Sequence, residues 1–420
     1  MSAVTRAEPE VVLTGLGVVA PTGIGATRFW ESCLVGASGI GPISRFDATG
    51  YPVRSAGEVR DFDPSGEVDP RVVVQTDLWT QFALVATRQA LREARLDPDE
   101  LDSFDVGVTT SASSGGNAFG QREIQALWSQ GPRHVGPYQS IAWFYAASTG
   151  QISIAHGFRG PCAVVCTESA GGLDAVAHSR RAIRTGCRVQ VCGGTEAPVS
   201  PYALTCQLQS GLLSEKNTYR PFARDASGYL PGEGGAVLVL EALDHARERG
   251  APVLAKVAGH AATFSGPHAS TADTEAWSRS AEALAAAIRL ALEDASLRPE
   301  QVDAVFADGM GVMGADEAEV TALRTVFGRG LDRVPVTALL AGVGRGYSGA
   351  AVLTVAAAVM AMGSGTVPPT PGLASGEVAY DVDLVTGRAR QRPLRHVLLL
   401  ARGFGGFTSA LVLSLPDLDE

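Results

Sequence analysis

Ser169 occupies the position in this chain whose surroundings best suit nucleophilic chemistry. An apolar run at residues 162–166 is followed by the polar Thr167, Glu168 and Ser169, and then by small residues at 170–172. This order predicts a strand, a tight turn and a helix. Such a turn raises one side chain beside a helix N-terminus, where backbone N–H groups and the helix dipole stabilise negative charge. Ser169 is therefore the candidate nucleophile.

Serine needs a partner to react. At neutral pH its side chain is a hydroxyl, so Ser169 can attack a substrate only if a histidine or lysine lies within hydrogen-bond reach. The sequence leaves two interpretations open. Either Ser169 acts with the help of such a base, or its hydroxyl is satisfied in the turn and caps the following helix, a position that serine favours.

The segment at residues 160–174 resembles the active-site segment of the β-ketoacyl synthases of fatty acid and polyketide assembly, in which a cysteine stands where this chain has Ser169. The resemblance implies that two histidines and a lysine should complete the site. Asp308 stands at the first histidine position and Arg345 at the second, while Leu340 stands at the lysine position five residues earlier. With all four positions changed, we expect no catalytic residue in this chain.

The framework of the family is present although its reactive groups are not. Segments that look like family framework occur at residues 193–198, 220–225, 232–235 and 403–406. Other segments look like the chain-length factors, or ketosynthase β subunits, of type II polyketide synthases: residues 119–123, 143–145, 149–152, 171–174 and 344–349. Chain-length factors usually carry glutamine at the elbow, so Ser169 is a departure, and a role of that glutamine in decarboxylation does not carry over.

The resemblance implies a non-condensing subunit that pairs with a ketosynthase α subunit and shapes its acyl tunnel, so setting polyketide chain length. The helix after Gly115 and Gly116 would cross the heterodimer interface and close the far end of the tunnel. Candidates for the tunnel wall are Asn117, Gly120, Ile124 and Ile141, and their modest size indicates a roomy tunnel. The alternative is that this helix belongs to the ordinary core.

Three further alternatives stay open at this point. Asp308 and Arg345 form a buried ion pair that fills the vacated site, or Arg345 is exposed. The chain is a silent partner, or an acyltransferase-like homologue that uses Ser169 as acyl acceptor, or a homodimeric scaffold that docks carrier proteins. The segment at residues 141–154 is apolar nearly all round, so either this chain or a second subunit must cover it.

An internal repeat indicates how the chain positions these residues. A pattern of Ala, Leu, Pro and Asp at residues 90–102 returns at residues 291–303, always 201 positions later, and each copy predicts a helix end, a Pro turn and the start of a strand. We therefore expect duplicated α/β halves with domains at residues 1–252 and 253–420. Ser169 belongs to the first half, and Asp308 and Arg345 to the second. Alternating strands and Ala-rich helices predict a layered α-β-α-β-α sandwich, the thiolase-like fold that the resemblance also implies.

Composition argues against several classes of binding partner. The 420 residues are 45% hydrophobic and 19% charged, with a net charge of −10 and no long basic cluster, which argues against nucleic acid and anionic membranes. If an acyl carrier protein is involved, it should act mainly on the partner subunit, since two acidic surfaces repel. The six cysteines lack metal-ligand or disulfide spacing and are expected to be mostly buried, and we expect neither metal nor cofactor. We expect no apolar run of membrane-spanning length, and no signal segment is evident, which predicts a cytoplasmic protein.

Overall fold

The computed structural model describes residues 8–266 and 273–416. The strands and helices of the first half are β1 (Val11–Ala20), β2 (Gly23–Ile24), α1 (Ala26–Leu34), β3 (Ile40–Pro42), β4 (Ser55–Gly57), α2 (Pro70–Val73), α3 (Leu78–Glu93), β5 (Val106–Ser111), α4 (Asn117–Gln130), α5 (Gln139–Ala142), α6 (Ala147–His156), β6 (Cys162–Val165), α7 (Gly171–Arg184), β7 (Val189–Glu196), α8 (Pro201–Leu208), β8 (Gly234–Ala242) and α9 (Leu243–Glu248).

The second half contains β9 (Ala255–Phe264), α10 (Thr274–Asp294), β10 (Ala304–Phe306), α11 (Met313–Phe327), β11 (Val336–Thr337), α12 (Leu340–Val343), α13 (Tyr347–Ser364), β12 (Thr366–Val367), β13 (Arg390–Gln391), β14 (His396–Arg402) and β15 (Phe407–Ser414). Single turns of 3-10 helix fill several connections, among them η4 (Glu168–Ala170), which leads into α7.

The two halves contribute the same order of five strands to one eleven-stranded sheet, in which β2 is the eleventh strand and pairs with β1. The first half runs β6-β5-β7-β8-β1 and the second runs β11-β10-β14-β15-β9. In each half the first three strands of this order are parallel and the remaining pairings are antiparallel. The halves meet where β1 pairs with β9 over two residue pairs. The predicted duplication is therefore confirmed at the level of strand order.

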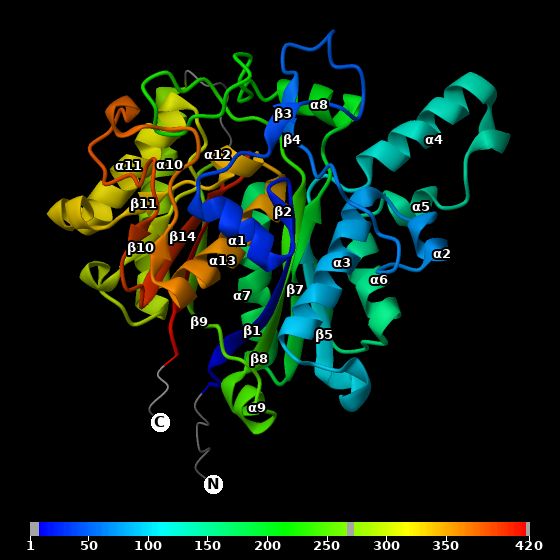
Figure 1. Ribbon diagram of the computed structural model, residues 1–420, viewed down its shortest axis with the longest axis horizontal. Coiled ribbons are helices and arrows are strands. Elements are labelled where there is room, and N and C mark those ends of the chain that lie inside the picture. The colour runs from blue at the N-terminus through cyan, green and yellow to red at the C-terminus, as the bar shows by residue number, and fades with distance from the viewer. Residues whose placement is uncertain (1–7, 267–272, 417–420) are drawn as a thin grey trace.

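Helices cover the sheet in layers, which follow one another from left to right in Figure 1. Helices α3 and α6 cover the outer face of the first half, and α10 and α11 cover the outer face of the second. Helices α7 and α13 pack against each other between the halves. Alternate residues of one strand thus enter different cores: Leu238 of β8 lies in the central core and Val237 in the outer one. This is the predicted α-β-α-β-α arrangement.

The same packing device recurs in both halves. A Cβ on Gly15 of β1 would come within 2.2 Å of the carbonyl oxygen of Ala90 in α3, and a Cβ on Gly259 of β9 would come within 2.2 Å of that of Ala291 in α10. The strand register slips immediately before each glycine. Glycine is required at both points because the helix backbone touches the strand backbone.

Helix α13 corrects one prediction. Its 18 residues have a mean hydropathy of 1.5, which is enough by length and composition to cross a membrane, so the expectation of no such run was wrong. In the fold, 78% of this stretch is buried. The helix is apolar because it lies in the central layer, with sheet on both sides and α7 alongside.

The apolar segment at residues 141–154 is divided by a turn at 143–146, which separates α5 from α6 and leaves aromatic side chains exposed. This chain therefore does not cover the whole segment, and cover by a second subunit stays a prediction. One prediction about burial was wrong. Of the six cysteines, three are exposed rather than buried: Cys162, Cys166 and Cys206. Cys162 belongs to β6, which in the described part of the chain pairs only with β5 and is thus an edge strand. The burial preference of a single residue type does not indicate which strand lies at the edge of a sheet.

Candidate functional site

Ser169 lies at the predicted elbow, between β6 and the N-terminus of α7. Ser169 is 3% exposed, and its hydroxyl has no hydrogen-bond partner among the described residues. It lies inside η4, and α7 begins after Ala170 without a side-chain cap. The interpretation of Ser169 as a helix cap or a satisfied turn hydroxyl was therefore wrong. The residue before it, Glu168, has a φ of 51°, so the left-handed residue of the turn is Glu168 and not Ser169.

Side chains from both halves hold the elbow in place. The Thr167 hydroxyl donates to Asp174 Oδ2 at 2.6 Å, and Asp174 Oδ1 lies 3.1 Å from His260 Nε2. The same nitrogen lies 3.0 Å from Ser409 Oγ. This Asp–His–Ser arrangement uses one ring nitrogen for both contacts and Ser409 is fully buried, so it ties α7 to β9 and β15 and does not form a catalytic triad.

Asp308 and Arg345 form the buried ion pair that was one of the two expected outcomes. Asp308 Oδ1 lies 2.9 Å from Arg345 Nη1, and both side chains are almost completely buried. Burial alone would lower the pKa of Arg345, but the carboxylate of Asp308 and, more weakly, that of Glu168 raise it above its usual value. The guanidinium therefore stays charged and cannot exchange a proton as a family histidine would.

Two partners in this cluster were missed at the sequence level. Arg402, at the end of β14, lies 3.2 Å from Asp308 Oδ2 and 2.7 Å from Glu319 Oε2. Glu319 in turn accepts the backbone N–H groups of Asp308 at 2.8 Å and Gly309 at 3.0 Å. The available signals were a lone arginine closing an apolar strand and a carboxylate on the buried face of α11. We call Asp308, Arg345, Arg402 and Glu319 the ion-pair cluster.

Two acids beside this region have altered proton affinity. Burial raises the pKa of Asp316 to about 7 although the backbone N–H groups of Phe222 and Gly311 donate to it. Burial also raises the pKa of Glu196 to about 8, against hydrogen bonds from Ser113, Ser348 and the residue after Ser113. Glu196 thus ties the loop before α4 to the start of α13.

Leu340 begins α12 and is buried in the central core. It lines a small apolar cavity together with Phe29 and Cys33 of α1 and Leu353 of α13. An ammonium group at this position would be surrounded by apolar atoms, so the position holds no vacant lysine site in this chain.

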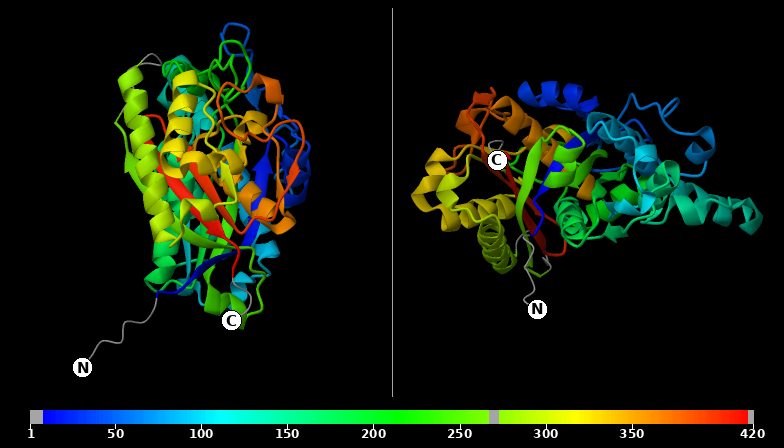
Figure 2. Two further views of the ribbon diagram at one scale, coloured as in Figure 1. Left: turned by 90° about the vertical axis from the view of Figure 1, so that its left-hand side faces the viewer. Right: turned by 90° about the horizontal axis from the view of Figure 1, so that it is seen from below.

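The predicted tunnel residues fall on a helical arm formed by α4, α5 and the turn at residues 143–146. Asn117, at the start of α4, is buried, and Ile141 in α5 is partly buried. A Cβ on Gly120 would come within 2.9 Å of the Trp143 ring, so its small size accommodates that ring and leaves no open space in this chain. Ile124 is 52% exposed and points out of the fold. Helix α4 extends beyond the layered body in Figure 1 and in the right-hand view of Figure 2.

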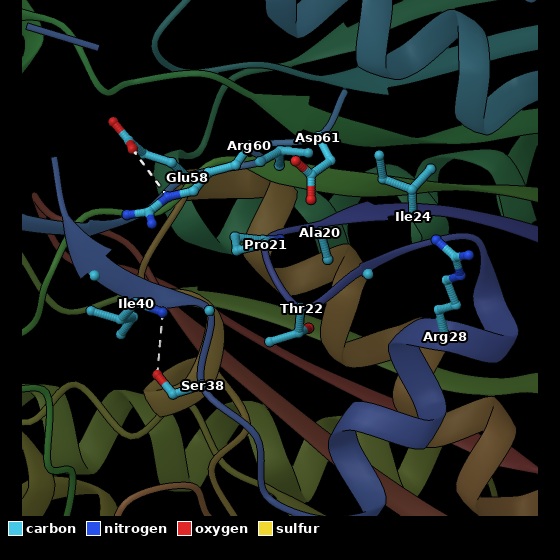
Figure 3. A pocket seen from close by; sticks show the side chains of 14 residues that line it. Ala20, Pro21, Thr22, Ile24, Arg28, Ser38, Ile40, Glu58, Arg60 and Asp61 are labelled. Carbon is cyan, nitrogen blue, oxygen red and sulfur yellow. Dashed lines mark hydrogen bonds and ion pairs between the residues drawn. The ribbon is translucent and has the colours of Figure 1, made fainter. Parts of the chain in front are cut away.

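A surface pocket of about 450 Å³ lies beside the hairpin of β1 and β2 (Figure 3). Its rim includes the ion pair of Arg60 with Glu58 and the hydrogen bond from the Ile40 N–H to Ser38 Oγ. Its lining shares no residue with the elbow, the ion-pair cluster or the predicted tunnel wall. Over residues 8–266 and 273–416, no group of three or more His, Cys, Asp or Glu side chains is placed to hold a metal ion.

Layered halves with an elbow serine directly before the central helix α7 define an α/β protein of the thiolase-like fold. The β-ketoacyl synthase N-terminal domain matches residues 8–246, and the β-ketoacyl synthase C-terminal domain matches residues 254–374. The chain therefore belongs to the β-ketoacyl synthase family.

The relatives narrow the subfamily. A putative polyketide β-ketoacyl synthase 2 of Streptomyces coelicolor is 53% identical over 409 residues, covering 96% of this chain and 94% of the relative. The tetracenomycin polyketide synthase ketoacyl synthase β subunit of Streptomyces glaucescens is 48% identical, covering 97% and 98%. Among solved structures, the ishigamide ketosynthase/chain length factor superimposes with a TM-score of 0.88 at 28% identity, covering 98% of this chain and 100% of that one.

Proposed function

We propose that this chain is a non-condensing chain-length factor of a type II polyketide synthase that pairs with a ketosynthase α subunit. The observation that carries the proposal is the state of the elbow and its surroundings. Ser169 replaces a thiol and its hydroxyl has no base beside it among the described residues. Asp308 and Arg345 are locked in a buried ion pair where proton-transferring side chains would be needed. The fold is complete, but the groups for condensation are absent from this region.

A partner subunit is supported by two unpartnered features of the described chain, the helical arm and the free edge of β6, which together we call the partner face. Exposed apolar side chains concentrate there: Trp128 is 81% exposed, and Ile124, Trp143, Phe144 and Tyr145 are also exposed. A projecting arm with this composition needs cover, because monomeric surfaces rarely expose large apolar patches. An unpaired strand edge can be closed by a strand of a second subunit.

The tunnel-wall role follows from this geometry. In the proposed heterodimer the outward side of α4 enters the partner, and Ile124 is the residue on it best placed to meet the growing acyl chain. Asn117, Gly120 and Ile141 lie further inside this subunit and support that side of the arm. The wall then sets product length by geometry, because a larger side chain leaves room for fewer malonyl-derived units.

The remaining assignments concern organisation and partners. We assign the halves to residues 1–252 and 253–420, which the equivalent contacts of Gly15 and Gly259 support. With a net charge of −10, this chain offers little attraction to an acidic acyl carrier protein, so the carrier engages mainly the ketosynthase α subunit. We place the complex in the cytoplasm, where carrier-bound intermediates are elongated, and we assign it no cofactor, metal, nucleic acid or membrane partner.

The test is co-expression with a ketosynthase α subunit that forms a stable complex with this chain, followed by mass spectrometry of the polyketide products. Ile124→Phe should shift the products to shorter chains, while Leu290→Phe should not. Leu290 is a matched control, since it is 48% exposed on α10, which covers the outer face of the second half. Gly120→Phe should also shorten the product, provided that the Trp143 ring swings aside.

Four outcomes would contradict the proposal. An unchanged product length for Ile124→Phe in an intact complex would remove the tunnel-wall role. Loss of product on Ser169→Ala, or an acyl adduct on Ser169 in intact-mass measurements, would make this chain an acyltransferase rather than a silent subunit. A stable homodimer of the chain alone in native mass spectrometry, with no preference for the α subunit, would favour a scaffold.

A further inference from the structure

A further surface pocket, of about 400 Å³, lies where the end of α3 meets the end of α6, and we call it the arginine pocket. The two helices pack against each other, as Figure 1 shows. The apolar part of the lining consists of Leu91, Leu96 and Pro98, and both leucines are buried in the fold. The pocket shares no residue with the elbow, the ion-pair cluster, the helical arm or the pocket in Figure 3. It is therefore a separate feature of the first half.

Basic side chains gather around this apolar wall. The nitrogen-bearing side chains that line the pocket are Arg88, Arg92, Arg95 and His156. Arg88 and Arg92 stand four residues apart on α3, so their like charges lie on one helix face and repel each other. The acidic residue of the lining, Asp97, directs a carboxylate oxygen to the backbone N–H of Asp99 at 3.0 Å. In a chain with a net charge of −10, the pocket is a local excess of positive charge.

The carboxylate of Glu67 neutralises only part of this charge, because two arginines share it. Its Oε2 lies 3.2 Å from Arg92 Nη1 and 3.9 Å from Arg88 Nη1. The side chains of Arg92 and Arg88 are 60% and 44% exposed. Each guanidinium has five N–H donors in a planar fork, so both have donors left for a second anion.

His156, the last residue of α6, contributes a ring nitrogen without a partner. Its Nε2 is buried and has no hydrogen bond to any described residue, and its ring stacks on Phe158 with 5.4 Å between the ring centroids. Burial lowers the pKa of His156, and the charge of Arg88 lowers it further, so the ring is neutral at pH 7 and one nitrogen carries a hydrogen. A buried polar atom without a partner costs free energy. An acceptor oxygen beside the ring would remove that cost.

We propose that the arginine pocket binds a flat aromatic carboxylate, with its carboxylate on Arg88 and Arg92 and its ring against Leu91 and Leu96. A guanidinium group pairs with a carboxylate through two parallel hydrogen bonds, and its plane also stacks on aromatic rings. Both parts of the ligand are needed. An inorganic anion would leave the apolar wall in water, and a neutral ring would leave the arginines with only Glu67 as counter-charge. The site is independent of the tunnel-wall role of the arm.

The test measures binding of 1-naphthoate to the full-length chain by isothermal titration calorimetry, with 1-naphthamide as the uncharged isostere. The wild type should bind 1-naphthoate and should bind 1-naphthamide much more weakly. Arg92→Gln should weaken the binding of 1-naphthoate by up to about fivefold, the range for an exposed charge pair, and Arg88→Gln/Arg92→Gln should abolish it. The matched control is Arg289→Gln, which changes an exposed arginine on α10 and should leave the affinity unchanged.

Glu67→Gln separates a binding site from a merely structural cluster. In the proposed site Glu67 competes with the ligand for the same two guanidinium groups, so its removal should tighten the binding of 1-naphthoate, again by up to about fivefold. If Glu67 instead holds the arginines in place, the same change weakens the binding and overturns the proposal. No binding by the wild type, equal binding of 1-naphthamide, or equal losses in Arg92→Gln and Arg289→Gln would also overturn it. Circular dichroism of each variant checks that these surface substitutions leave the fold intact.

Discussion

At mildly acidic pH, substitution of Asp308 should destabilise the fold more than substitution of its partner Arg345, although each substitution removes one side of the same ion pair. The ion-pair cluster contains two cations and two anions, and Asp308 is the only member that contacts both guanidinium groups, at 2.9 Å and 3.2 Å. Asp308→Asn leaves Glu319 as the only carboxylate of the cluster beside the two guanidinium groups of Arg345 and Arg402. Arginine cannot lose its proton at any accessible pH, so the excess positive charge remains buried. We expect a loss of about 3–5 kcal/mol in the free energy of unfolding.

Arg345→Met leaves an excess of buried negative charge, which the uptake of a proton by a carboxylate can neutralise. Burial already raises the pKa of Glu319 above its ordinary value, against the effect of Arg402. Without Arg345 that pKa rises further, and the folded state takes up a proton. The remaining cost of Arg345→Met comes from the buried carbonyl of Arg402, which no longer receives the hydrogen bond from Arg345. We expect this to lower the free energy of unfolding by about 1–3 kcal/mol.

The sign of the pH dependence follows from this. A carboxyl group whose pKa is raised in the folded state stabilises the fold below its unfolded pKa, and that contribution is lost as pH rises through the folded pKa. Arg345→Met should therefore lie closest to the wild type near pH 5 and furthest near pH 8. The cost of Asp308→Asn should not grow over this range. Because Asp316 also titrates here, with a pKa of about 7, the difference from the wild type is the quantity to compare.

The assay is urea unfolding at pH 5 and pH 8, followed by circular dichroism and by tryptophan fluorescence to check that both probes report one transition. The double variant Asp308→Asn/Arg345→Met keeps the balanced contact of Arg402 with Glu319. It should be more stable than the sum of the single losses implies, which gives a favourable coupling energy. A cost of Arg345→Met that is independent of pH, or a double variant with strictly additive losses, would refute the charge-balance argument.

Two further predictions concern the scaffold. Burial alone would raise the pKa of Glu241, but hydrogen bonds from Arg249 and two other side chains lower it to about 2, so Glu241 contributes about 3 kcal/mol of stability above pH 5 that is lost as pH falls towards 2. Glu241→Gln should lower the urea midpoint at pH 7 and flatten the acid limb of the pH profile, and an unchanged acid limb would contradict this. Gly259→Ala should destabilise by about 1–3 kcal/mol because its Cβ meets the Ala291 carbonyl oxygen. The control, Gly363→Ala on the exposed end of α13, should be neutral or slightly stabilising, by about 0.5–1 kcal/mol; equal effects of the two would exclude the close contact as the cause.

The sequence was sufficient for the features that depend on local patterns. The order of residues around Ser169 predicted the elbow, because apolar, polar and small residues follow one another as a strand, a turn and a helix require. The 201-residue repeat predicted two equivalent halves, since both copies preserve the helix end that packs on a strand glycine. The replaced positions at Asp308 and Arg345 could be located by resemblance, and their opposite charges made an ion pair one of two reasonable outcomes.

The features that depend on tertiary contact could not be predicted in the same way. Arg402 meets Asp308 across 94 positions of the chain and lies in a different strand, so no local spacing signals the contact. The free hydroxyl of Ser169 depends on the backbone step at Glu168, which the preference of serine for helix caps does not encode. The exposure of Cys162 depends on β6 being the last strand of the sheet, and the break at residues 143–146 leaves the apolar pattern of that segment unchanged.

The position of β1 has a consequence for the way this chain is made. β1 lies between β8 and β9, so both of its main partners are synthesised more than 200 residues after it. At a translation rate of about 5–20 residues per second, the nascent β1 strand waits roughly 10–45 s for these two partners and can pair meanwhile only with the two residues of β2. Throughout that time an almost wholly apolar segment is exposed on the ribosome. We expect the newly made chain to depend on chaperones and to fold slowly, because its central strand can be ordered only after more than half of the protein has emerged.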